Sequence, residues 1–334
     1  ERVQAKAAQL SADDRMKIEF CLGKAYLDSG ETAKAFAHFD EGNRQKRATL
    51  QGFDVAMFEK YVDSAIRLFD KNLVARLGDK GGARGTAPKL KVGNTRTGKT
   101  QTDQILSSHP DVTSIGEAKC MAQSVPFFAN AEVPGFFAPK QPSITQQLTD
   151  SLTPEAVTAI GRRYLALSQA QAGGAKRISD KMLFNHFWVG MIFAALPDAK
   201  IVHCTRDPAD IALSLWQLLF PAGMPWVYDQ RDIARYYLAY KKLMAHWGKL
   251  YPGRIFEANY ETMVANQETE TRRLLDFCGL SFDASCLNFH ESARQVKTAS
   301  ATQVRQPIYK TSVRKWEKYR DHLQPLLETL GDSA

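Results

Sequence analysis

The sequence predicts an α/β fold in three layers, a parallel sheet with helices on both faces, preceded by a small all-α segment. Three observations carry this prediction. Residues 93–100 (GNTRTGKT) form a glycine-rich loop between a short apolar run and a helical pattern. Beyond Pro88, short apolar runs alternate with helical segments, which is typical of a parallel sheet covered on both faces. Residues 1–77 are helical, without strand-like runs.

Length and composition allow about two globular domains, since the chain has 334 residues and a domain takes roughly 150. Hydrophobic residues make up 44% and charged residues 24%, which excludes a disordered or collagen-like chain. The longest apolar run, residues 187–196, is much shorter than the ~20 residues that span a bilayer, so we expect no membrane span. Because Glu1 is not a methionine, we expect either that the chain was trimmed or that an upstream segment is missing.

Charge and cysteine content narrow the partners and the compartment. Lys and Arg total 44 against 36 acidic residues, so the net charge of +8 favours an anionic partner. The basic clusters form no recognisable nucleic-acid module, so we expect a small phosphorylated ligand rather than nucleic acid. The five cysteines are scattered and include no C-x-x-C pair, which indicates reduced thiols in the cytoplasm and no structural metal.

The helical segment at residues 1–77 contains one match to the tetratricopeptide pattern, at residues 15–47. With Gly23 aligned on the glycine of the pattern, the other key positions hold Leu22, Tyr26, Ala35 and Phe39. One repeat cannot bury its face alone, so we expect further upstream repeats or a capping helix at residues 4–10. A generic helical hairpin is the alternative.

Residues 47–76 continue the helical pattern, and residues 78–88 form a linker to an α/β domain at residues 89–334. Spacings of four and three place Phe58, Val62, Ile66 and Phe69 on one helix face. Four glycines and a proline between positions 78 and 88 favour irregular backbone.

The α/β domain alternates predicted strands and helices. The strands are expected at residues 90–92, 201–205 and 254–258, with a weaker one at 176–179. The helices are expected at residues 99–106, 154–171, 184–196, 207–219, 231–251 and 268–278. Residues 121–149 predict an irregular excursion of the kind that builds substrate walls, and Phe127 and Phe137 would make such a wall apolar.

The loop at residues 93–100 fits G-x-x-x-x-G-K-[ST] at every fixed position, directly after a strand and before a helix. Its glycines let the backbone approach an anion closely, and its amide hydrogens face that anion. The N-terminus of the following helix adds partial positive charge. The loop therefore predicts a bound phosphate group.

The strand predicted at residues 201–205 is followed by Arg206 and Asp207 and has no convincing magnesium ligand. Asp207 precedes Pro208, a pair that is typical of a helix cap. The guanidinium of Arg206 and the hydroxyl of Ser214, two turns into the next helix, can both reach a second phosphate. We therefore expect a ligand with two separate phosphate groups and no required metal.

Five separated motifs resemble those of sulfotransferases that use 3′-phosphoadenosine 5′-phosphosulfate (PAPS). Residues 91–117 are similar to the 5′-phosphosulfate loop of that family, and residues 202–214 (VHCTRDPADIALS) to its 3′-phosphate motif. Residues 180–182 (DKM), 259–261 (NYE) and 298–316 also match. The resemblance covers nearly the whole chain and points to a bacterial subgroup in which tetratricopeptide repeats precede a domain similar to tyrosylprotein sulfotransferases.

The resemblance implies PAPS as donor, 3′,5′-adenosine bisphosphate as product, a P-loop sulfotransferase domain and a bacterial cytosol. It implies Glu117 as the general base, since a carboxylate that faces a bound hydroxyl can take its proton. Lys181 would donate to the bridging oxygen, and Arg96 would stabilise the leaving phosphate with it. The implied donor-binding residues are Arg96, Thr97, Gly98, Lys99, Thr100, Gln101, Arg206, Ser214, Arg305 and Ser312.

The chain departs from the subgroup at Asn94 and Thr95, where Met-Pro is usual, and at Lys99, where Thr is usual. Because this lysine completes a formal Walker A loop, an ATP-dependent kinase that uses Lys99 and Mg²⁺ remains an alternative. A non-catalytic repeat scaffold with a nucleotide-binding domain is another. At single residues, Glu117 could be a structural ion-pair partner or helix cap, and Lys181 a surface lysine. The acceptor stays open, as does a protein or peptide partner of the repeat segment.

Overall fold

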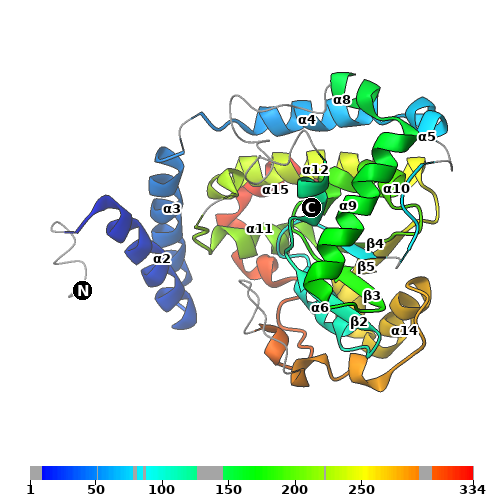
Figure 1. Ribbon diagram of the computed structural model, residues 1–334. Coiled ribbons are helices and arrows are strands. Elements are labelled where there is room, and N and C mark those ends of the chain that lie inside the picture. Colours follow the sequence, from blue (N-terminus) through cyan, green and yellow to red (C-terminus); the bar gives the residue numbers. More distant parts are fainter. Residues whose placement is uncertain are drawn as a thin grey trace.

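Five parallel strands form the central sheet, in the order β2-β3-β1-β4-β5 (Figure 1). The computed structural model describes residues 10–50, 52–77, 81–85, 88–125, 146–221, 223–292 and 303–333. The strands are β1 Lys89–Val92, β2 Val112–Gly116, β3 Arg177–Asp180, β4 Lys200–Thr205 and β5 Ile255–Asn259. The predicted α/β fold with a parallel sheet is therefore confirmed.

Strand β2 has no counterpart among the strands predicted from the sequence. It lies at the edge of the sheet, and Val112 is its one buried residue. A strand at the edge of a sheet is less buried than a central strand, so it needs fewer apolar side chains. Because Thr113 and Ser114 are polar, β2 lacks the continuous apolar run by which the other strands were predicted.

Helices cover both faces of the sheet, as predicted. The pleat sends alternate residues of β4 to opposite faces, so Ile201 packs in one hydrophobic cluster and Val202 in another. The helices on the Ile201 side are α4 Val55–Leu68, α9 Pro154–Ala172, α10 Val189–Ala195 and α12 Gln230–Leu250. Those on the Val202 side are α6 Lys99–Ser107, α13 Tyr260–Ala265 and α14 Gln267–Phe277.

The other α-helices of the α/β body are α5 Lys71–Leu77, α7 Cys120–Ser124, α8 Gln146–Ser151, α11 Pro208–Trp216 and α15 Gln324–Leu330. Helix α11 begins as predicted, because the Asp207 side chain accepts a hydrogen bond from the Asp210 amide across 2.9 Å. Helices α7 and α8 correct the expectation of irregular backbone throughout residues 121–149. Residues 126–145, with Phe127 and Phe137, lie outside the described residues.

Within the described ranges, no helix combines the length and the apolar character needed to cross a membrane. The apolar run at residues 187–196 instead forms the end of the 3-10 helix Asn185–Trp188 and helix α10. Both pack in the core beside the sheet.

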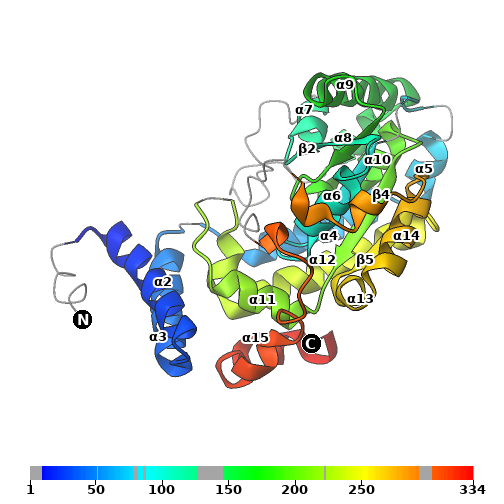
Figure 2. The same ribbon diagram turned by 90° about the horizontal axis from the view of Figure 1, so that it is seen from below.

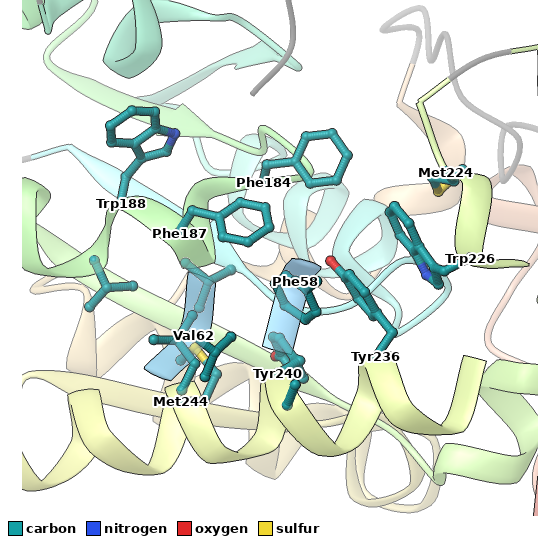
Figure 3. Close-up of a cluster of buried hydrophobic side chains, with 14 of the residues drawn as sticks. Phe58, Val62, Phe184, Phe187, Trp188, Met224, Trp226, Tyr236, Tyr240 and Met244 are labelled. Atoms are coloured by element: carbon teal, nitrogen blue, oxygen red, sulfur yellow. The ribbon is translucent and has the colours of Figure 1, made fainter. Parts of the chain in front are cut away.

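An aromatic cluster joins α4 to α12 (Figure 3). Phe58 stacks on Tyr236 with ring centroids 4.2 Å apart, and Trp226 stacks on the same tyrosine at 4.1 Å. Phe187 meets Phe58 edge-on at 5.6 Å. Helix α4 thus shares a core with elements that follow the predicted linker, and the division of the chain at residues 78–88 stays a prediction.

Helices α2 Ala12–Asp28 and α3 Thr32–Ala48 form a hairpin that stands beside the α/β body (Figures 1 and 2). Gly23 leaves room for Phe39, since a Cβ there would come within 2.7 Å of the ring. The segment predicted at residues 15–47 is thus a helical hairpin, whereas residues 1–9, with most of the proposed capping helix, lie outside the described residues. Helix α3 docks through Asn43, whose Nδ2 donates to Trp216 O across 2.9 Å.

Candidate functional site

Every strand of the sheet is followed by a residue that lines one cavity. The cavity has a volume of about 560 Å³ and receives Arg96 from the loop after β1, Glu117 after β2 and Lys181 after β3. Arg206 follows β4 and Tyr260 follows β5. The carboxyl ends of parallel strands are where open α/β sheets commonly bind ligands.

This cavity brings together all predicted site residues except Thr97 and Arg305. Those that line it are Arg96, Gly98, Lys99, Thr100, Gln101, Glu117, Lys181, Arg206, Ser214 and Ser312. Thr97 is buried in the loop, where its hydroxyl donates to Asn94 O across 2.8 Å. The Arg305 guanidinium donates to Ser292 O across 2.7 Å.

The loop after β1 turns sharply before α6. Gly93 approaches β4 so closely that a Cβ would lie 2.7 Å from Cys204 O, and Gly98 has φ +83° at the N-terminus of α6. Arg96 also has a positive φ, 70°, which side-chain-bearing residues rarely adopt. Such strained backbone is common at binding sites, because the surrounding structure must hold it in place.

Lys99 points back into its own loop. Its Nζ donates to Gly93 O and Asn94 O, each across 2.6 Å. Burial lowers the pKa of Lys99 to about 7, and the positive charge of Lys181 acts in the same direction. At pH 7 the lysine that completes the Walker A pattern is therefore divided about equally between the ammonium and the neutral amine in the free protein.

Glu117 and Lys181 form an ion pair, with Lys181 Nζ 2.8 Å from Glu117 Oε1. The Lys181 side chain is 4% exposed and that of Glu117 is 35% exposed, so the carboxylate is the more accessible partner. Their strands meet at this point, where the Lys181 amide donates to Gly116 O across 2.9 Å. Lys181 is therefore a buried lysine rather than a surface one.

Arg96, Arg206 and Ser214 lie together at the other end of the loop. Arg96 Nε donates to Ser214 Oγ across 2.7 Å, and Arg206 donates to Arg96 O and to Ser312 O. Burial lowers the pKa of Arg96, and the nearby charge of Arg206 lowers it further. Arg206 Nε is buried with no hydrogen-bond partner among the described residues. Two adjacent guanidinium groups with a spare donor are suited to a phosphate group.

Tyr260, Lys315 and Lys24 are among the cavity residues that the sequence analysis did not identify as ligand contacts. The centroid of the Tyr260 ring lies 4.7 Å from the guanidinium carbon of Arg206. A Cβ at Gly98 would come within 3.0 Å of the same ring. Lys315 and Lys24, from helix α2, also line the cavity. Tyr260 belongs to the 259–261 motif, whereas no local pattern marks Lys24, because the docking of the hairpin brings it there.

One part of the cavity wall is apolar. Leu183, Leu218, Phe220, Pro221 and Met224 line it. Phe220 is held by Tyr228, whose hydroxyl accepts from the Phe220 amide and donates to its carbonyl, each across 3.0 Å. Met224 Sδ accepts from Thr95 Oγ1 across 3.3 Å, which joins this wall to the loop. The apolar wall expected from Phe127 and Phe137 lies outside the described residues.

A metal centre is not assembled in the part of the chain that the structure describes, where no group of three or more His, Cys, Asp or Glu side chains could hold an ion. Asp207, the carboxylate nearest to a Walker-type position in the sequence, is engaged as the cap of α11. Among the described residues that line the cavity, the charged side chains are cations, apart from Glu117 and Asp210.

Comparison with known proteins gives a consistent picture. A model described as "Sulfotransferase family" matches residues 90–284, more than half of the chain. A protein of Caenorhabditis briggsae named "Putative protein-tyrosine sulfotransferase" is 23% identical over 72% of this chain and 86% of its own length. An uncharacterised protein of Aquifex aeolicus (strain VF5) is 30% identical over 95% of this chain. The chain spans only 42% of that relative's length.

Among solved structures, the sulfotransferase domain from the Synechococcus PCC 7002 olefin synthase resembles the chain with a TM-score of 0.50. The match covers 77% of this chain and 98% of that domain at 18% sequence identity. At this level of identity the match supports a shared fold and carries no information on ligands.

Proposed function

The chain belongs to the sulfotransferase family, and from this premise we propose that it transfers a sulfuryl group from PAPS to an acceptor hydroxyl or amine. The observation that carries the proposal is the single cavity that holds the phosphate loop, the Arg206 and Ser214 pair, and the Glu117 and Lys181 ion pair. The first two groups suit the two phosphate positions of the donor, and the third suits the reacting end.

The cavity residues fit a donor with phosphates at its 5′ and 3′ positions. Loop amides at the start of α6, together with Thr100, would hold the 5′-phosphosulfate, because a helix N-terminus favours an anion. Arg206 would hold the 3′-phosphate with Ser214 and Ser312, and its unpartnered Nε supports this assignment. Arg305 would act only if its loop moved toward the cavity, since it now contacts Ser292.

During transfer, the bond from sulfur to the bridging phosphate oxygen breaks as a bond from the acceptor to sulfur forms. Glu117 would accept the proton of the acceptor, and its greater exposure makes it the member of the ion pair that can face an acceptor. Lys181 would donate to the bridging oxygen, and Arg96 and Lys99 would neutralise the leaving phosphate. No metal is needed when these cations carry the charge.

The apolar part of the cavity wall supports an acceptor whose reacting group is attached to an apolar body. Asp210 and Ser214 of α11 line the cavity, and the apolar Leu218 and Phe220 follow beyond the end of that helix, farther along the chain from Arg206. A protein or peptide acceptor could also reach the α2–α3 hairpin, because Lys24 borders the same cavity.

The second candidate function is an ATP-dependent kinase, which is favoured by Lys99 at the Walker A position. A thermal-shift comparison of 3′,5′-adenosine bisphosphate with Mg-ATP separates the two, since a ligand stabilises the fold in proportion to its binding. We expect a larger shift with the bisphosphate, followed by transfer of label from PAPS to a member of an acceptor panel. Stabilisation by Mg-ATP alone would favour the kinase, and bisphosphate binding without any transfer would favour a non-catalytic scaffold.

A further inference from the structure

Asp103, on the face of α6 that packs against the sheet, contacts three neighbouring strands. Ser114 Oγ of β2 donates to Asp103 Oδ2 across 2.8 Å, and Lys91 Nζ of β1 lies 3.0 Å from Asp103 Oδ1. Ser179 of β3 donates to the same Oδ1 and accepts from Lys91. Lys91, Asp103 and Ser179 are each at most 1% exposed, so this network is shielded from solvent.

The three tethered strands are those that present the proposed reacting groups. In the sheet, β2, β3 and β1 are consecutive neighbours. Ser114 stands three positions before Glu117, Ser179 two before Lys181, and Lys91 two before Gly93, the start of the loop. Each tie therefore lies within about 10 Å of chain from the group that its strand presents.

We propose that Asp103 is a positioning residue, which fixes the phosphate loop, Glu117 and Lys181 relative to one another. It does so through its contacts with Lys91, Ser114 and Ser179. The inference rests on the proposed function, since it concerns the alignment of that same site. Asp103 lies on α6, the helix that follows the loop, and its one carboxylate contacts all three strands. These contacts fix the distances between the strand ends, and therefore between the groups that the strand ends present.

A buried charge pair is poorly explained by stability alone. Removing two charges from water is costly, and replacement of a buried ion pair by neutral side chains is often neutral or stabilising. An uncharged core at these positions would be expected to support the same sheet. Alignment of reacting groups is a stronger reason for such a network, because a misplacement of about 1 Å can lower turnover about 100-fold.

Two variants separate alignment from stability in the full chain. Ser114→Ala removes the tie to β2, together with the hydrogen bond that Ser114 Oγ accepts from the Gly116 amide across 3.1 Å, and leaves the Lys91 and Asp103 charges paired. Ser168→Ala is its matched control. Ser168 is likewise buried, and its hydroxyl donates to Leu165 O within α9. The double variant Lys91→Met/Asp103→Asn removes both charges and the tie to β1, while the amide of Asn can still bond the two serines; Asp103→Asn alone is its reference.

For Ser114→Ala, we expect kcat to fall about 10- to 100-fold, with Tm and the affinity for 3′,5′-adenosine bisphosphate close to those of Ser168→Ala. For the double variant, we expect Tm to recover relative to Asp103→Asn, while affinity for the bisphosphate and kcat both stay low. Recovery of kcat and affinity together with Tm would overturn the proposal, as would equal kcat in Ser114→Ala and Ser168→Ala.

Bisphosphate affinity is measured by calorimetry without turnover, so this test does not depend on the reaction. A wild-type chain that binds the bisphosphate but transfers nothing from PAPS would refute the proposed function. In that case the loss of affinity in the stable double variant would still support the tie between Asp103 and the loop, and unchanged affinity would refute it.

Discussion

Lys181 Nζ lies 2.8 Å from Glu117 Oε1, so the two residues proposed to handle the acceptor proton and the leaving oxygen form a single ion pair. Their strands, β2 and β3, are neighbours whose ends meet through the Lys181 amide and Gly116 O. The pair keeps a cation at 4% exposure beside a carboxylate that remains 35% exposed. Lys181 is therefore the buried member of the pair and Glu117 the accessible one, and both line the cavity.

Glu117→Gln should lower kcat by about 10²- to 10⁴-fold, because the amide can accept a hydrogen bond from Lys181 but cannot take a proton. Affinity for 3′,5′-adenosine bisphosphate should change little. Glu59→Gln is the matched control, since Glu59 pairs with Arg235 at 2.7 Å and is 36% exposed, outside the cavity lining. Steady-state kinetics and thermal melts on both variants decide. If Glu117→Gln melts lower than the control but retains its kcat, Glu117 is a structural ion-pair partner and not the general base.

Arg206→Ala should weaken binding of 3′,5′-adenosine bisphosphate roughly 10- to 150-fold, the effect of one charged hydrogen bond of ~1.5–3 kcal/mol. Adenosine 5′-phosphosulfate, which has no 3′-phosphate, should bind almost as well as to the wild type. Calorimetry with both nucleotides makes the comparison within one variant. Because Arg206 also donates to Arg96 O and Ser312 O, equal losses would mean that it organises the loop instead.

Transfer from PAPS should persist in excess EDTA. Arg96, Lys99 and Lys181 line the cavity and would supply the charge that a metal supplies in triphosphate chemistry. The measurement is the initial rate with chelator, and again after Mg²⁺ is restored. Transfer from PAPS that vanishes with EDTA and returns with Mg²⁺ would mean that these cations do not replace a metal.

Binding of 3′,5′-adenosine bisphosphate at pH 8 should take up protons, to a limit of about one per nucleotide. Burial lowers the pKa of Lys99 to about 7, so at pH 8 its free side chain is mostly neutral. A phosphate dianion beside Nζ favours the ammonium and raises that pKa, and the proton then comes from the buffer. Calorimetry in two buffers of different ionisation enthalpy measures the uptake.

Lys99→Met is the control for this proton uptake, since it removes the amine and leaves the nucleotide's own protonation unchanged. The difference in uptake between wild type and Lys99→Met should shrink at pH 6, where the wild-type amine is already charged before binding. Identical proton uptake by the two proteins at pH 8 would mean that Lys99 does not gain a proton when the nucleotide binds. Lys99 Nζ would then keep its hydrogen bonds to Gly93 O and Asn94 O.

The stability of the free protein should respond to the same lysine. The pKa of Lys99 is about 7 in the folded protein and 10.5 for an ordinary lysine, so the unfolded chain binds the proton more tightly. The free energy of unfolding should therefore rise with pH between those two values, and change little from this group below or above them. Denaturant titrations from pH 6.5 to 9 should show this slope in the wild type and a weaker slope in Lys99→Met.

Local features of the site follow from the sequence itself. The loop pattern at residues 93–100 specifies left-handed glycine at Gly98 and a helix start at Lys99, and Asp207 followed by Pro208 specifies the cap of α11. These depend on hydrogen bonds and backbone angles within a few residues, so neighbouring side chains suffice to determine them. The alternation of strands and helices likewise determined the three-layer α/β class.

The sequence also determined which strand ends carry charge, but the strand order decided which charges meet. Nothing within residues 91–117 states that β3 lies between β1 and β2, and this placement pairs Lys181 with Glu117 and Lys91 with Asp103. Likewise, the docking of the α2–α3 hairpin, and no local pattern, brings Lys24 to the cavity. Such contacts depend on the packing of the whole chain, because their free energy is realised only when segments far apart in sequence exclude water together.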